Sequence, residues 1–257
     1  MIDPQSKACF ARAKGGDHTL SSIPAAEYRF ERVEKKFWMT AEQYRGLLPT
    51  LNAHLKQDRY GDSAVCNIYY DTVDYALIRR SVERPLFKEK LRLRSYGLPE
   101  ENGKVYVEIK RKLNGIGYKR RIAVPFAEAK KLLRGEAITC SDPQIEGEIL
   151  AFVRRYRPKP MVFLSYRRTA MTDENDPDLR VTADTELRYR LEDAERPGKN
   201  GMKPILEDDS MVLLEIKALG AIPLWLTEEM SRLRIYQAPF SKIGTVYTRH
   251  IAPTAAY

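Results

Sequence analysis

Basic residues and carboxylates occupy alternate positions in several short β-like segments of this chain. Residues 90–94 read Lys-Leu-Arg-Leu-Arg, and residues 108–110 and 215–217 both read Glu-Ile-Lys. Because successive side chains of a strand point to opposite faces, such a segment places its charges on one face and its aliphatic residues on the other. Several of these strands in one closed sheet would enclose an interior lined with Arg, Lys and a few acids. That interior suits a polyanion that carries metal ions.

A single strand of this kind is equally typical of an ordinary antiparallel sheet with one wet face. Here, however, the pattern recurs in six or more segments that contain few Ser, Thr or Asn, and amphipathic helices are available to cover the apolar side. If helices cover the outside, the charged faces must point inward. Inward charges are unfavourable unless they are paired or bound to a ligand, so we expect either dense ion pairing or a bound polyanion, and we favour the polyanion.

Composition limits the class of protein. The chain has 257 residues, which is long enough for one domain with a sizeable core, and its formal net charge of +9 favours an anionic partner without identifying it. The three cysteines form no CxxC pair, which argues against a disulfide framework or zinc site and fits a reducing compartment. No stretch approaches the length of a membrane span. We therefore expect a cytoplasmic protein.

The elements that must position these charges follow from periodicity and turn signals. Residues 1–26 lack periodicity and are expected to form a flexible leader before a single domain at 27–257. After a first strand, Thr40-Ala-Glu-Gln43 predicts a capping box and a helix that continues to about Leu55. Further strands are predicted at about 64–70, 86–96, 104–112, 117–124, 161–170, 178–190 and 211–218. Helices are predicted at about 126–134, 143–155 and 227–234, and segment 191–210 is predicted to be an exposed loop.

The order of the charged motifs resembles that of the VTC domain, the polyphosphate polymerase domain of the vacuolar transporter chaperone complex. This domain belongs to the CYTH or triphosphate tunnel metalloenzyme superfamily. The resemblance covers about residues 28–250, and it depends on the number and order of the motifs. In chain order these are Arg32-Val-Glu34-Lys-Lys36, Ile68-Tyr-Tyr-Asp71, Lys90-Leu-Arg92-Leu-Arg94, Val107-Glu108-Ile-Lys110, Tyr118-Lys119-Arg-Arg121, Ser165-Tyr-Arg-Arg168, Arg180-Val-Thr-Ala-Asp184, Leu214-Glu215-Ile-Lys217 and Phe240-Ser241-Lys242.

The resemblance implies an α+β fold, an eight-stranded antiparallel β-barrel tunnel with helices packed outside. It also implies that basic residues of the tunnel bind polyphosphate and the phosphates of a nucleotide. The implied catalytic residues are Lys36, Arg92, Arg94, Lys110, Lys119, Arg180 and Lys242, and the implied further substrate-binding residues are Arg32, Arg121, Arg168 and Lys217. For Arg168 the inward orientation depends on the resemblance alone, because alternation places apolar residues of segment 161–170 on the same face.

The resemblance implies Mn²⁺ or Mg²⁺ as cofactor, with Glu215 as the first metal ligand and Glu34 and Asp184 as candidates to complete the shell. Glu108 and Glu186 share the inferred face, but an ion pair with a basic neighbour explains them at least as well. The chain departs from the Glu-x-Glu-x-Lys signature of the wider superfamily, since it has Arg32-x-Glu34-x-Lys36. This difference favours the VTC type over the adenylyl cyclase or thiamine triphosphatase branches.

The leading hypothesis is a metal-dependent polyphosphate polymerase that transfers the terminal phosphoryl group of ATP to a growing chain. Such a reaction needs alignment and charge neutralisation more than a covalent nucleophile. The alternatives are a metal-dependent tripolyphosphatase or nucleoside triphosphatase and a non-catalytic polyphosphate-binding domain. Nucleic-acid binding ranks last, because no recognition motif accompanies the basic residues. The expected partners are ATP and inorganic polyphosphate, together with a separate membrane partner wherever the product must leave its compartment.

Overall fold

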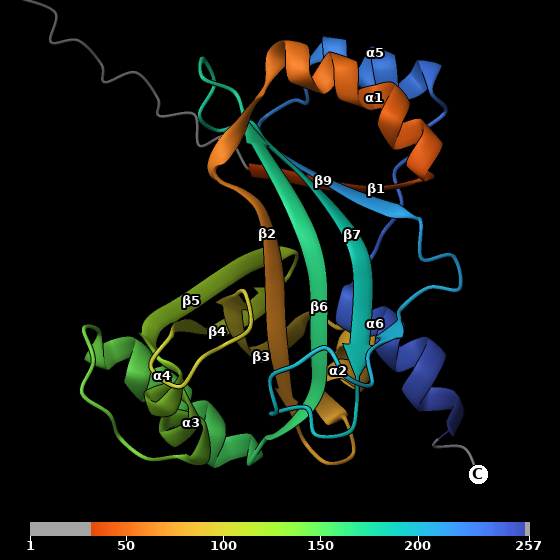
Figure 1. Ribbon diagram of the computed structural model, residues 1–257. Helices are drawn as coiled ribbons and strands as arrows, with labels where there is room; N and C mark the ends of the chain where they lie inside the picture. Colours follow the sequence, from red (N-terminus) through yellow and green to blue (C-terminus); the bar gives the residue numbers. More distant parts are fainter. Residues whose placement is uncertain (1–31, 255–257) are drawn as a thin grey trace, which may run out of the picture. The chain divides into compact units, whose positions relative to one another are not determined.

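The computed structural model describes residues 32–254, with Arg32, Arg59, Tyr60 and Thr254 described for their backbone only, so the leader expected at 1–26 lies outside the described residues. Within this range the strands form one antiparallel sheet (Figure 1). The strands are β1 (Arg32–Met39), β2 (Lys56–Asp71), β3 (Phe87–Tyr96), β4 (Lys104–Leu113), β5 (Ile116–Pro125), β6 (Lys159–Thr172), β7 (Arg180–Arg190), β8 (Lys203–Pro204) and β9 (Val212–Leu219).

Eight of these strands follow one another across the sheet in the order β1-β9-β7-β6-β2-β3-β4-β5, and the short β8 pairs with β7. The sheet curls, and register shifts in the β2–β6 and β6–β7 pairs mark bulges, which increase local twist. The prediction of an antiparallel eight-stranded fold with helices outside is confirmed. Among the described strands no pairing joins β1 to β5, so the sheet is a half-barrel rather than a fully hydrogen-bonded cylinder.

Two helices cover the outer face of β1, β9 and β7. α1 (Ala41–His54) begins at the predicted capping box, in which the Thr40 side chain accepts from the backbone of Gln43 and the Gln43 side chain accepts from the backbone of Thr40. α5 (Leu224–Arg232) packs beside it (Figure 1). Their apolar residues join a buried cluster with the aliphatic side chains of β1, β7 and β9. The charged residues of these strands therefore face the other way, toward the inside of the curl.

A second pair of helices, α3 (Phe126–Arg134) and α4 (Pro143–Tyr156), covers the outer face of β3, β4 and β5 (Figure 1). Both were predicted, and α4 begins with Asp142 as its cap and Pro143 in its first turn. The aliphatic residues that alternate along β3, β4 and β5 lie on one face of the sheet and pack against these helices. The opposite parity, which carries Arg92, Glu108 and Arg121, is thus the inner face.

The sequence did not predict α2 (Ala76–Val82) or α6 (Lys242–Val246), nor the π-helical turn Tyr247–Ile251 and the 3-10 turn Ala252–Thr254. Residues of α2 and α6 and of the π-helical turn pack on Val162, Leu164 and Tyr166 of β6. This part of the inner face is therefore apolar because helices cover it. The alternation in segment 161–170 that placed apolar residues beside Arg168 was correct.

Segment 191–210 is only in part the exposed loop that was predicted. β8 lies within it and pairs with β7, while Ala194 and Ile205 are buried. None of the helices in the described part of the chain is long and apolar enough to cross a membrane.

Candidate functional site

The strand register of β3, β4 and β5 brings the inner-face charges into rows. Arg92 lies opposite Glu108, which lies opposite Arg121, and Lys90 lies opposite Lys110 in the neighbouring row. Lys119 completes that second row on β5. One side of the curl thus presents cations from three adjacent strands, as alternation predicted.

Glu108 is the buried centre of this cationic group. Its side chain has no exposed surface; its Oε2 accepts from Nε of Arg92 at 2.7 Å, and its Oε1 lies 3.0 Å from Nζ of Lys119. Arg121 approaches the same carboxylate at 3.9 Å. Burial opposes the ionisation of Glu108, but the charges of Arg92, Arg94 and Lys119 outweigh it and lower the pKa of this carboxyl to about 2. Glu108 therefore fixes the positions of three cations.

Polar side chains of β2 and β6 hold the two arginines from the other side. Arg92 donates to the Tyr69 hydroxyl at 3.3 Å, and Arg94 donates to Oδ1 of Asn67 at 3.0 Å and to the Tyr166 hydroxyl at 3.2 Å. Both arginines are more than nine-tenths buried. Sequence reasoning missed Asn67, Tyr69 and Tyr166. Only their parity, which matches that of neighbouring charged residues, could have indicated them.

A second group of charges lies on β1 and β9. The register places Lys36 opposite Glu215 and Glu34 opposite Lys217. Lys217 lies 2.9 Å from Glu215 and 3.9 Å from Glu34, while Lys36 lies 3.3 Å from Glu34 and 3.7 Å from Glu215. The lysine charges overcome the burial of Glu215 and lower the pKa of its carboxyl well below the usual range. These four residues form a square of two carboxylates and two lysines.

Asp184 on β7 is the centre of a third group and is fully buried. Its two oxygens accept from Nε and Nη2 of Arg168 at 2.6 and 2.8 Å, and Oδ2 also accepts from Nζ of Lys242 at 2.5 Å. Burial opposes its ionisation, but Lys242 and Arg168 lower its pKa. The resemblance predicted that Arg168 points inward, and this ion pair shows that it does.

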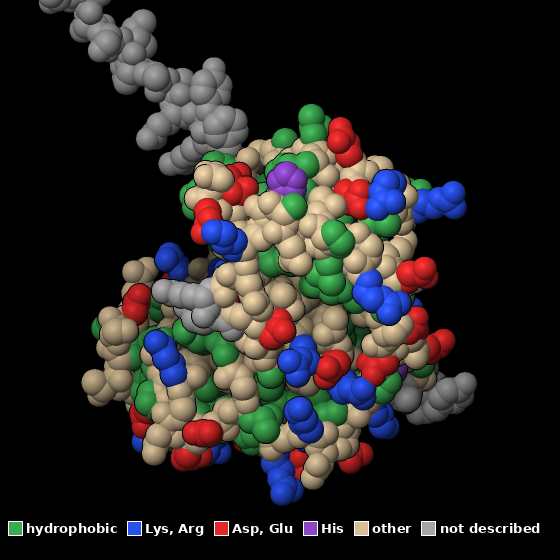
Figure 2. Space-filling view, turned by 45° about the horizontal axis from the view of Figure 1, so that its top comes forward, with side chains coloured by type: hydrophobic (Ala, Val, Ile, Leu, Met, Phe, Trp, Pro, Cys, Tyr) green, Lys and Arg blue, Asp and Glu red, His purple; other side chains and the backbone are tan. Residues whose placement is uncertain are grey.

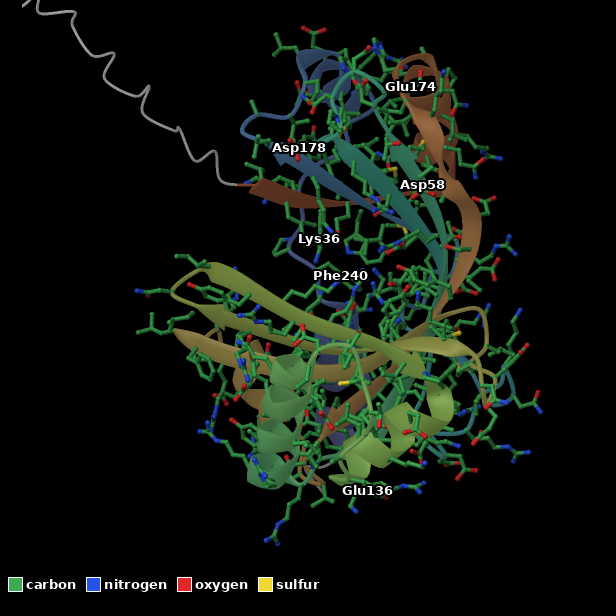
Figure 3. All side chains as sticks on the ribbon, turned by 90° about the vertical axis from the view of Figure 1, so that its left-hand side faces the viewer. Lys36, Asp58, Glu136, Glu174, Asp178 and Phe240 are labelled. Carbon is green, nitrogen blue, oxygen red and sulfur yellow. The ribbon has the colours of Figure 1, made fainter. Side chains whose placement is uncertain are left out.

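The segment that leads into α6 crosses the inner face and contacts several strands. Lys36 donates to the carbonyl oxygen of Phe240 at 3.3 Å, and the Phe240 ring packs edge-on against Trp38 with centroids 4.4 Å apart. Figure 3 shows Lys36 and Phe240 next to each other below β1. Lys90 donates to Ser241 at 3.4 Å. Residues far apart in the sequence, from β1, β3, β7 and the C-terminal segment, therefore meet in one site.

The remaining predicted residues fall in different places. Arg180 is on the inner face beside Lys217 and pairs with Asp58 of β2 at 2.8 Å. The backbone of Arg32 pairs with Leu219 in β1, but its side chain lies outside the described residues. Glu186 does not share the face of Asp184, because a bulge with a positive φ at Glu186 interrupts the alternation of β7, and its carboxylate instead approaches Arg167, with both side chains more than half exposed.

Lys90 also belongs to the site, although it was not among the residues predicted from the sequence. The alternation that identified Arg92 and Arg94 also points to it. Burial lowers the pKa of Lys90 to about 8, and the neighbouring Arg92 charge, together with burial, lowers the pKa of Lys110 to about 6. Both shifts indicate a strongly positive inner face.

The carboxylates differ in their suitability for a metal ion. Among the described residues no three His, Cys, Asp or Glu side chains converge as a ready-made metal site. Asp184, which the resemblance selected as a ligand, is fully buried with both oxygens hydrogen-bonded to Arg168 and Lys242, so a metal ion would reach it only if these ion pairs opened. Glu34 and Glu215 also pair with Lys36 and Lys217, but both side chains keep exposed surface. They therefore fit better as the one or two carboxylates that Mg²⁺ or Mn²⁺ needs when phosphate oxygens supply the other ligands.

Comparison with solved structures shows only weak similarity. A candidate adenylate cyclase from Vibrio parahaemolyticus is 10% identical with a TM-score of 0.43, covering 84% of this chain and 97% of that one. A Pyrococcus horikoshii OT3 protein is 12% identical with a TM-score of 0.46, covering 86% and 100%. A candidate adenylyl cyclase from Hippeastrum, described as having a dominant triphosphatase activity, is 15% identical with a TM-score of 0.44, covering 85% and 95%. At these scores the similarities carry no argument about activity.

Sequence comparison is more informative. The chain is 25% identical over 286 aligned positions to vacuolar transporter chaperone complex subunit 4 of Trypanosoma brucei brucei, and the alignment covers 88% of this chain. It covers 36% of the relative, so the chain spans about a third of that protein's length. The profile of the VTC domain matches residues 31–249, which include every strand described above. This chain therefore belongs to the VTC domain family.

Proposed function

We propose that this protein is a metal-dependent polyphosphate polymerase that transfers the terminal phosphoryl group of ATP to an inorganic polyphosphate chain. The observation that carries the proposal is the inner face itself, where cations from seven strands and α6 surround a set of carboxylates too few to neutralise them. A polyanion with evenly spaced charges matches such a face. Membership of the VTC domain family supports the same conclusion.

The inner-face cations divide into fixed and available ones. Arg92 uses all three guanidinium nitrogens on Glu108 and Tyr69, so it acts as a preorganised charge. Lys119 and Arg121 are exposed and can bind phosphate oxygens without leaving the cluster, and the exposed Lys110 can join them once a bound anion restores its charge. Arg121 offers the planar fork that suits bidentate contacts, while the lysines act as point charges past which a chain can move.

In the proposed reaction a terminal oxygen of the polyphosphate chain attacks the γ-phosphorus of ATP. A bond forms between these two atoms as the bond from the γ-phosphorus to its bridging oxygen breaks, and ADP leaves with that oxygen. The attacking oxygen is already anionic, so no general base is needed, and the cations hold donor and acceptor in line. A metal ion held by Glu215 and Glu34 would supply further neutralisation of the phosphate oxygens.

The charge distribution on one face of the molecule favours a phosphate ligand over nucleic acid. On the face in Figure 2, Lys and Arg side chains are interspersed with Asp and Glu and form no continuous basic patch. A nucleic-acid duplex needs such a patch on an exposed face.

The test is incubation of the purified protein with ATP and Mn²⁺, then Mg²⁺, with long polyphosphate resolved on a gel and free phosphate assayed in the same tube. Adjacent residues of β5 provide matched variants: Arg121→Ala removes an inner cation, whereas Arg120→Ala removes one that pairs with Glu148 of α4. We expect polymer with little free phosphate from the wild type and from Arg120→Ala, and a loss of polymer in Arg121→Ala. Free phosphate without polymer would establish a triphosphatase instead. The absence of both products would indicate a binding domain.

A further inference from the structure

Two tyrosines lie side by side where β3 and β4 leave the cationic cluster. Tyr96 ends β3 and Tyr106 lies in β4, with ring centroids 6.0 Å apart and planes at 85°. Both share the parity of Arg92, Arg94 and Glu108, so both belong to the inner face. Neither is a member of the three buried hydrophobic clusters, and half of Tyr96 is exposed. Core packing therefore does not explain this aromatic pair.

The pair directly borders the residues assigned to phosphate binding. Tyr106 lies opposite Arg94 in the register, and the guanidinium carbon of Arg121 lies 4.5 Å from the centre of the Tyr106 ring. The same guanidinium approaches Glu108 at 3.9 Å. Along β3, Arg92, Arg94 and Tyr96 follow one another at every second residue, which separates them by about 7 Å each. A ligand that follows β3 would thus pass from guanidinium groups to aromatic rings within about 7 Å.

An inorganic phosphate chain has no group that stacks on an aromatic ring, whereas a nucleotide has its base. A nucleobase stacks on aromatic side chains and on guanidinium planes, and such stacking tolerates different bases. We propose that Tyr96 and Tyr106, together with Arg121, form a subsite that stacks on the base of a nucleoside triphosphate donor. This inference depends on the proposed function and adds how the donor is recognised and oriented.

The subsite gives the donor a direction. With the base at Tyr96, the triphosphate extends along β3 past Arg94 and Arg92 toward Lys90. The acceptor chain then meets the γ-phosphate from the Lys90 end of the inner face. Stacking without hydrogen bonds to base edges also predicts that adenine and guanine nucleotides bind with similar affinity.

The test compares two ligands that share a triphosphate but differ in the base. Calorimetric titration of the whole protein would use adenosine 5′-(β,γ-imido)triphosphate, which resists turnover, and inorganic tripolyphosphate. For Tyr96→Ala with Tyr106→Ala we expect the Kd of the nucleotide to rise about tenfold, the magnitude typical of base stacking, and the Kd of tripolyphosphate to stay unchanged. Tyr96→Phe should bind both ligands like the wild type, because it keeps the ring.

The control is Tyr118→Ala, which removes an exposed tyrosine from the other face of the same hairpin and should change neither affinity. The subsite alone would be overturned if the double variant kept the wild-type circular dichroism spectrum and either of two results followed. One is an equal rise in the Kd of both ligands, and the other is an unchanged Kd of the nucleotide. A wild type that binds tripolyphosphate but not the nucleotide would also overturn it and would favour a triphosphatase. A wild type that binds neither ligand would refute the proposed function itself.

Discussion

Replacement of Glu108 by Gln should destabilise the ligand-free protein and make its stability unusually sensitive to a bound polyanion. The substitution keeps the shape of the side chain but removes the negative charge that holds Arg92, Lys119 and Arg121. Removal of one partner from a buried ion pair typically lowers the free energy of unfolding by roughly 3–5 kcal/mol. The ligand-free variant would retain a group of cations with no central counter-charge.

The pKa of Glu108 gives a second route to this magnitude. A folded-state pKa of about 2 lies roughly 2.5 pH units below the ordinary value of 4.5, which corresponds to about 3 kcal/mol. Because the pKa is lowered on folding, this contribution is fully present above about pH 4.5 and is lost as the pH falls toward 2. At neutral pH the variant should therefore lose about 3 kcal/mol, or roughly 6–12 °C in Tm for a domain of this size.

The assay is thermal unfolding at pH 7 with and without inorganic tripolyphosphate. In the wild type, ligand at a hundred times its Kd should stabilise the fold by about 2.7 kcal/mol. In Glu108→Gln the ligand also replaces the missing counter-charge, so the rise in Tm should be larger than in the wild type.

Glu148→Gln is the matched control, since Glu148 pairs with Arg111 and Arg120 on the outer side of the same strands. It should lose at most about 1 kcal/mol and show the ligand response of the wild type. A Glu108→Gln variant as stable as the wild type, or one whose Tm rises with tripolyphosphate no more than that of Glu148→Gln, would refute the reasoning.

Three further predictions concern other parts of the molecule. The pKa of Lys110 is lowered to about 6, so in the ligand-free protein this lysine is mostly neutral above pH 6. A bound anion should restore its charge, and binding at pH 8 should therefore be accompanied by proton uptake. Calorimetric titration in buffers of different ionisation enthalpy should detect this uptake, and Lys110→Gln should reduce it. Asp184→Asn should leave the Mn²⁺ concentration for half-maximal activity unchanged, whereas Glu215→Gln should raise it, and the opposite order in a metal titration would return Asp184 to the metal site. Thr40→Ala should remove the cap of α1 and lower the free energy of unfolding by about 1 kcal/mol, which a urea titration measures.

Much of the inner face was predictable because side-chain direction in a strand is a local property. The alternation in β3 placed Arg92 and Arg94 on one face and Leu91 and Leu93 on the other, and the structure confirms this division. The same alternation places Lys90 on the face of Arg92, so the sequence also indicates this lysine. The capping box of α1 was predictable for the same reason, since its hydrogen bonds join residues three apart.

The alternation rule gave a wrong prediction where one residue changed the backbone conformation of a strand. The positive φ of Glu186 forms a bulge that interrupts the alternation of β7, so Glu186 left the face that it was predicted to share with Asp184. Short helices were also unpredictable, since α2 and α6 depend on apolar partners in β6 and have little periodicity of their own.

Except in β7 beyond Asp184, the sequence by itself determined which residues of the charged strands share the inner face, and with it the excess of positive charge in the site. Only the tertiary structure decided which cations each carboxylate contacts: Glu108 and Asp184 are buried among the cations that they hold, whereas the more exposed Glu215 and Glu34 share two lysines. It also decided that Tyr96 and Tyr106 border the inner-face cations Arg94 and Arg121. The physical reason is that alternation depends on adjacent residues, while ion pairs, burial and aromatic contacts depend on the register between strands that are distant in the chain.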